Sequence, residues 1–175
     1  MENGRCRRAR AAIVAASFVL AVAASAAEPF DASSAFDRLK SLEGTWTGTA
    51  GHGDGEGPAS VVYHVVGGGS AVVETLFPGT PHEMVTVYHR DGERLVLTHY
   101  CTAGNQPRMR FEKSATPGEI AFAFDGGTNL KPERDGHMHQ ALIRVVDDDH
   151  IVSEWTYYAE GKPGSTAKFR LERKK

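Results

Sequence analysis

Two pairs of potential metal ligands in this sequence are each separated by a single residue. His137 and His139 form one pair, and His99 and Cys101 form the other. Residues two apart on a β-strand point to the same face of a sheet, so each pair is able to grip one metal ion. A zinc site needs three or four such ligands, with neutral imidazoles and ionised thiols. With His82 added, these residues support one hypothesis, a metal-binding protein or metal-dependent enzyme.

Histidine and amide side chains serve equally well as hydrogen-bond partners in a pocket for an organic molecule. This second hypothesis is the one we adopt, with an apolar wall and a few polar contacts. The residues predicted to bind a small, partly apolar molecule are Met84, Tyr88, Leu95, Leu97, His99, Asn105, Gln106 and His139. A rim that binds nothing is a third interpretation. Haem held by one histidine is a fourth, although no feature singles out that histidine, and the sequence specifies no cofactor.

Motifs of established catalytic chemistry do not occur in the sequence. It contains no serine nucleophile elbow, no zinc-protease helix and no phosphate-binding P-loop. Cys101 could act as a nucleophile beside His99 or His82, but a single cysteine is more often a small buried apolar residue. We therefore predict no catalytic residue and favour a binding protein over an enzyme.

Strands must position these side chains, because runs rich in Val, Thr, Tyr and Phe recur at short intervals between turn residues. A short amphipathic stretch with Phe36, Leu39 and Leu42 on one face precedes them. The predicted strands are 44–50, 59–66, 71–77, 83–90, 93–101, 107–113, 119–125, 137–147, 150–158 and 165–173. This pattern predicts an all-β fold, an up-and-down antiparallel barrel of about ten strands with a short N-terminal helix closing one end.

The dipeptide Asp91-Gly92 is the strongest local turn signal and predicts a two-residue hairpin. A turn at these two residues places Met84 opposite His99 and His82 opposite Cys101. These residues then lie toward one end of the barrel.

Loop lengths distinguish the two ends of such a barrel. Tight turns and the helix share one end, and the other end collects the longer connections 51–57, 78–81, 102–106 and 126–136. We call these the closed end and the mouth, and binding is expected at the mouth. The sequence leaves open which face of strand 137–147 points inward.

The segment Gly44-Thr45-Trp46, after a short helix, resembles the Gly-x-Trp opening of the lipocalin-like (calycin) barrels. The resemblance implies that Trp46 closes one barrel end beneath a basic residue of the last strand, Arg170 or alternatively Arg173. The stretch from Glu83 to Pro107 also resembles an uncharacterised family of secreted bacterial proteins with this fold. That family brings no established activity.

Residues 1–27 have the pattern of a signal peptide, and residues 28–175 are predicted to form a single domain. Several arginines precede an apolar run, Ala11 to Ala23, which is shorter than the roughly 20 residues that a spanning helix needs. We expect an exported protein, periplasmic or extracellular, without stable membrane insertion after cleavage. The 20 basic and 22 acidic residues leave a net charge of −2, which argues against a nucleic-acid partner. Oligomeric state is not predicted.

Overall fold

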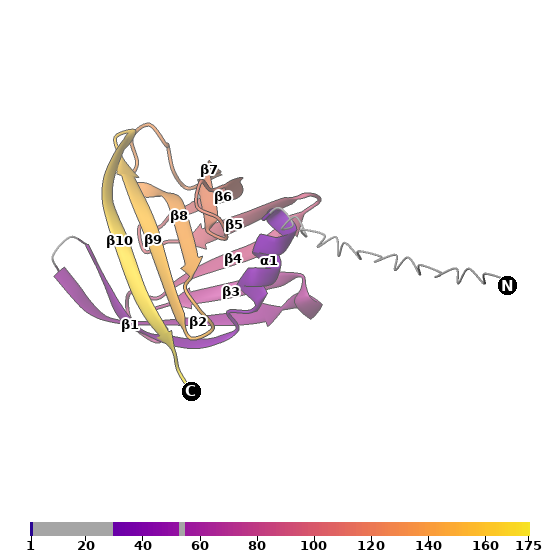
Figure 1. Ribbon diagram of the computed structural model, residues 1–175. Helices are drawn as coiled ribbons and strands as arrows, with labels where there is room; N and C mark the ends of the chain where they lie inside the picture. The colour runs from indigo at the N-terminus through magenta and orange to yellow at the C-terminus, as the bar shows by residue number, and fades with distance from the viewer. Residues whose placement is uncertain (2–29, 53–54) are drawn as a thin grey trace.

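The computed structural model describes Met1, residues 30–52 and residues 55–175, and apart from Met1 the predicted signal peptide lies outside these described residues. The described chain forms a closed barrel of ten antiparallel strands with one short α-helix before it (Figure 1). The elements are α1 (Ala32–Lys40), β1 (Gly44–His52), β2 (Gly55–Val66), η1 (Gly67–Gly69), β3 (Ala71–Leu76), β4 (Met84–Asp91), β5 (Arg94–Tyr100), β6 (Gln106–Lys113), β7 (Ile120–Thr128), β8 (His137–Val145), β9 (His150–Ala159) and β10 (Lys162–Arg173). The predicted fold class is confirmed.

Each strand pairs with its neighbours in the sequence, and β10 closes the barrel by pairing with β1. Burial alternates along the strands, as expected when one face of each strand points into the barrel. In β3, for example, Val72, Glu74 and Leu76 are buried, and the residues between them are partly exposed. Successive connections therefore alternate between the two ends, which separates the closed end from the mouth.

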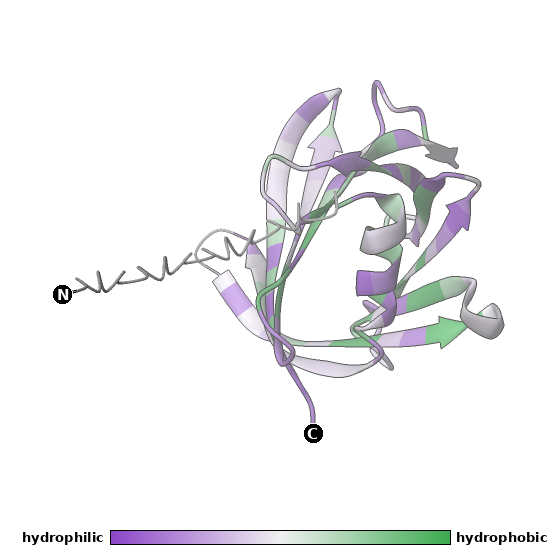
Figure 2. Cartoon of the chain, turned by 45° about the vertical axis from the view of Figure 1, so that its right-hand side comes forward, coloured by the Kyte–Doolittle hydropathy of each residue, from purple (hydrophilic) through white to green (hydrophobic). Residues whose placement is uncertain are grey.

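The closed end is sealed by α1 and by the tryptophan of the Gly-x-Trp segment. Asp31 caps the helix by accepting hydrogen bonds from the backbone amides of Ser33 and Ser34. Phe36 and Leu39 are buried within the barrel end, and Figure 2 shows α1 lying inside the ring of strands. No helix among the described residues is long and apolar enough to cross a membrane.

The basic residue over Trp46 is Arg173, and the prediction of Arg170 is wrong. The Arg173 guanidinium lies 4.2 Å from the centroid of the indole ring, and its Nη1 donates a hydrogen bond to the Glu43 carbonyl at 2.7 Å. Arg173 lies over the indole because it is the cross-strand partner of Trp46, and side chains of paired residues lie on the same face of a sheet. Arg170 lies on the outer face of β10, where it forms an ion pair with Glu56.

The register of the β4–β5 hairpin also differs from the prediction. Asp91 pairs with Arg94, so the two turn residues are Gly92 and Glu93, with Gly92 at φ 59°. As a result, His99 lies opposite Thr86 rather than Met84. The shift is by two residues, which leaves every side chain on the face that was predicted.

Candidate ligand-binding site

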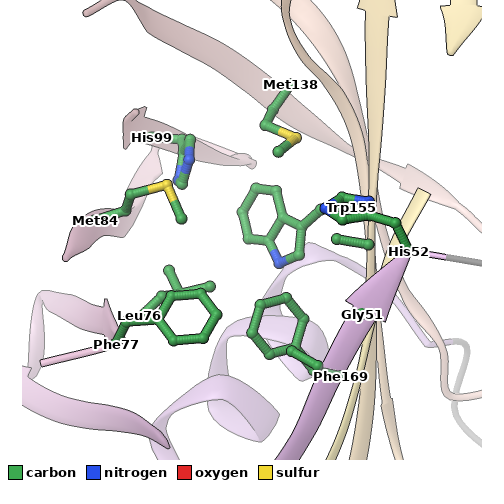
Figure 3. Close-up of a pocket in the computed structure, with 11 residues that line it drawn as sticks. Gly51, His52, Leu76, Phe77, Met84, His99, Met138, Trp155 and Phe169 are labelled. Carbon is green, nitrogen blue, oxygen red and sulfur yellow. The ribbon is translucent and has the colours of Figure 1, made fainter. Parts of the chain in front are cut away.

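A cavity of about 190 Å³ lies inside the barrel near its mouth (Figure 3). Its lining comes from the mouth-side parts of β1, β3, β4, β5, β8, β9 and β10 and from the residue that follows β3. The apolar lining residues include Leu76, Phe77, Met84, Met138, Ala167 and Phe169. Of the residues predicted to bind a ligand, Met84 and His99 line this cavity. It is therefore a largely apolar space with few polar atoms.

His99 is the buried polar residue of this lining. Only 1% of its surface is exposed, and its Nδ1 lies 2.9 Å from the Thr86 hydroxyl oxygen. The other ring nitrogen, Nε2, is buried and has no hydrogen-bond partner. Burial lowers the pKa of His99 from 6.5 to about 4, because a charged imidazolium would lose its hydration there. His99 is thus neutral at physiological pH.

Trp155 of β9 provides the second unpartnered polar atom of the lining. Its ring centroid is 4.8 Å from that of His99, with 35° between the two planes. The indole Nε1 is buried and lacks a hydrogen-bond partner, and in Figure 3 it points toward Phe77 and Phe169. Trp155 was not among the residues predicted to bind a ligand. The alternation Ile151, Ser153, Trp155 along one face of the strand was the signal that could have identified it.

Glu74 lies one pleat deeper than Leu76 and is completely buried. Its two carboxyl oxygens accept hydrogen bonds from the hydroxyl groups of Tyr63 and Tyr88, each at 2.7 Å. Burial raises the pKa of Glu74, and hydrogen bonds from Tyr88, Tyr63 and Thr86 act against that rise. These polar groups form a hydrogen-bonded floor beneath the cavity.

Three residues predicted as cavity wall belong to the core instead. Tyr88 bonds to Glu74 and packs against Phe122, with ring centroids 5.5 Å apart. Leu95 and Leu97 are buried on the same face of β5 as His99, but closer to the closed end. All three side chains point into the barrel, as predicted, but they lie below the cavity rather than in its wall.

The predicted polar contacts from the loops serve to join segments at the mouth. The Asn105 side-chain amide donates to the Gly136 carbonyl at 2.8 Å. The Gln106 side-chain oxygen accepts from Thr128 at 2.8 Å and from Asn129 at 2.7 Å. Neither side chain lines the cavity. Asn105 is bonded to the β7–β8 connection, and Gln106 is bonded to the end of β7 and to the residue that follows it.

His137 and His139 lie next to each other, but away from the other candidate ligands. A register irregularity between Met138 and Gln140 places a bulge at His139, where β8 pairs with β9. The His137 Nε2 and the His139 Nδ1 are 2.9 Å apart and form a hydrogen bond. The His139 ring stacks on Tyr158, with centroids 3.8 Å apart. This bulge turns His139 from the predicted cavity contact into part of an aromatic cluster.

The five predicted metal ligands do not come together. His82 is exposed in the β3–β4 connection, His99 is bound to Thr86, and Cys101 begins the β5–β6 connection. Across residues 30–52 and 55–175, no group of three His, Cys, Asp or Glu side chains is arranged to hold a metal ion. The spacing within each pair, His137 with His139 and His99 with Cys101, was suitable for binding one metal ion, but the barrel separates one pair from the other.

The protein is thus a closed ten-stranded antiparallel barrel with a largely apolar cavity near its mouth. No protein-family model matches the chain, and no curated protein matches it. Among solved structures, the chain is similar to the crystal structure of Rv2717c from M. tuberculosis, with a TM-score of 0.53 and 18% sequence identity. The alignment covers 81% of this chain and 98% of that chain. At this level of identity, the similarity concerns the fold alone.

Proposed function

We propose that this protein is an exported barrel that binds a small, partly apolar molecule in the cavity at its mouth. The observation that carries the proposal is the cavity lining, an apolar wall that contains two buried nitrogen atoms without partners. An unsatisfied buried polar group costs roughly 1 to 3 kcal/mol, and a bound molecule that pairs with these nitrogens removes that cost.

The size of the cavity limits the ligand. An apolar cavity of about 150 Å³ in another protein accepts benzene, and this cavity has about 190 Å³. A single ring or a short chain therefore fits without rearrangement of the barrel. The flexible thioethers of Met84 and Met138 in the wall allow modest adaptation to its shape.

Export and the calycin relationship are parts of the same proposal. The signal-peptide pattern of residues 1–27 supports export. The resemblance to calycins is supported by the helix before the first strand and by Trp46 with the Arg173 guanidinium above it. Barrels closed at one end commonly bind a ligand within the other.

Native mass spectrometry of protein purified from its own exported compartment tests the binding function. We expect the wild-type protein to carry an additional small organic mass. Ala167→Leu places three more carbon atoms in the cavity and should abolish that mass. Ala121→Leu is the matched control, because Ala121 lies on the outer face of β7 between the buried Ile120 and Phe122. An added mass that survives Ala167→Leu would place the ligand elsewhere, and the absence of any bound mass would contradict the proposal.

A further inference from the structure

The outer surface of the barrel has a charged side and an uncharged side. On β6, β9 and β10 the outward residues include ion pairs such as Arg110 with Glu112 and Lys168 with Glu154. On β2 to β5, by contrast, the outward residues of segments 62–66, 71–75, 85–89 and 96–100 include no Asp, Glu, Lys or Arg. We call these outward residues the valine face, because six of the twelve are valine.

The valine face is a regular grid, in which three rows of residues cross four neighbouring strands (Figure 1). The central row is His64, Val73, Val87 and Thr98, which are cross-strand partners in that order. The rows on either side pair in the same way, and every residue of the grid is at least partly exposed. With about 4.8 Å between strands and about 6.7 Å between alternate residues, the grid and its margins cover roughly 400 Å².

The absence of charge from this grid restricts what can cover it. A nucleic acid or a charged protein surface would lose hydration there without meeting a counter-charge. A membrane surface site would need basic side chains and several aromatic or large apolar anchors, whereas Tyr100 is the single Phe, Tyr or Trp of the grid. The charged residues at one edge, Asp91 and Arg94, pair with each other. A second copy of this chain offers the same uncharged face and covers the grid without burying an unpaired charge.

We propose that the protein forms a homodimer through the valine face, with a two-fold axis close to Val73 and Val87 at its centre. Two sheet faces pack about 10 Å apart with their side chains interdigitated, and a two-fold axis lets one patch serve both partners. The two grids together provide roughly 800 Å², less than the 1,200 to 2,000 Å² of a typical stable complex. The dimer is therefore weak and reversible. Because the face lies on the side of the barrel, both mouths stay open in the dimer.

Sedimentation equilibrium over about 5 to 500 µM protein tests this proposal, at pH 8 so that histidines are uncharged. We expect the molar mass of the wild type to rise from that of a monomer toward that of a dimer. Val87→Asp places a charge at the centre of the interface and should weaken the dimer at least tenfold. Val152→Asp is the matched control, because Val152 is a partly exposed outward valine of β9 that lies opposite Arg144 and Arg170. Circular dichroism checks that each variant is folded.

A second variant covers the case in which Val87→Asp does not fold. Thr98→Glu also adds a charge to the central row, and the strand pairing places its carboxylate opposite Arg108 of β6, which favours folding. It should weaken the dimer as Val87→Asp does. Wild-type protein that stays monomeric at the highest concentration would overturn the proposal. A dimer that the valine-face variants leave intact, or that Val152→Asp weakens equally, would lie elsewhere and would overturn it too.

Discussion

Acidification from pH 6.5 to about 4 is expected to destabilise the folded barrel through His99. In the unfolded chain this histidine has its ordinary pKa of about 6.5, whereas burial in the folded barrel lowers its pKa to about 4. Between these values the unfolded state binds a proton that the folded state excludes. Stability is therefore unaffected by His99 above pH 6.5 and is lost as the pH falls toward 4. The difference in pKa corresponds to roughly 3 kcal/mol, a large part of the 5 to 15 kcal/mol typical of a folded domain.

Other groups titrate in the same range, so the wild-type curve alone does not isolate His99. The pKa of His139 is also lowered, first by burial and then by the charge of His137, and this adds to the acid destabilisation. The raised pKa of Glu74, caused by burial, acts in the opposite direction. Hydrogen bonding and charge from Asp147 raise the pKa of His150, and the stability linked to that residue is lost as the pH rises.

Comparison with His99→Gln removes these shared contributions, because glutamine retains polarity but does not titrate. Urea denaturation followed by far-ultraviolet circular dichroism, at several values between pH 7 and pH 4, gives the free energy of unfolding of both proteins. The wild-type free energy relative to that of His99→Gln should fall by about 3 kcal/mol across this range. His139→Gln is the matched control and should change the slope less, since its imidazole is partly exposed. A difference between wild type and His99→Gln that stays constant with pH would refute the conclusion that His99 is held neutral.

Two further predictions concern the closed end and the N-terminus. Trp46→Ala is expected to lower the free energy of unfolding by about 3 to 5 kcal/mol, because it empties a fully buried position beneath Arg173. Arg170→Ala should change it by no more than about 0.5 kcal/mol, as an exposed ion pair contributes little, and equal effects of the two variants in chemical denaturation would contradict this account. Exported protein is expected to begin at Ala27 or Glu28, because small residues precede that position, and N-terminal sequencing that found Met1 intact would reject the signal peptide.

The barrel could be predicted from the sequence because its signals are local. Alternating apolar residues define a strand and turn residues end it, so the strand order followed without knowledge of long-range contacts. The β4–β5 hairpin shows the limit of this reasoning. The dipeptide Asp91-Gly92 predicted a two-residue turn, whereas the turn in the structure is Gly92-Glu93, and the two registers differ by two residues. Since the side-chain period is two, His99 faced the interior in either case; a slip of one residue would have turned it outward.

The same alternation could have identified Arg173 but could not have identified the position of His139. Phe169 and Leu171 are buried, so a residue two further along β10 must share their face, and Arg170 cannot. A bulge breaks the period of two, and the bulge at His139 arises where β8 pairs with β9. No local pattern in the segment His137 to Gln140 marks it. Predictions based on alternation therefore fail where strands depart from regular pairing.

The alternation of buried and exposed residues predicts which face of a strand points inward. It does not predict how far along the barrel axis, between the closed end and the mouth, a residue lies. Tyr63, Tyr88 and Trp46 are fully buried large side chains that fill the interior below the cavity. Nearer the mouth, β1 and β10 contribute Ala50 and Ala167, whose small side chains leave space inside. The cavity thus forms because large residues fill the lower layers and small ones occupy the upper layer of two adjacent strands. Only the pairing of β1 with β10, which joins the two ends of the described chain, brings these two alanines to the same wall.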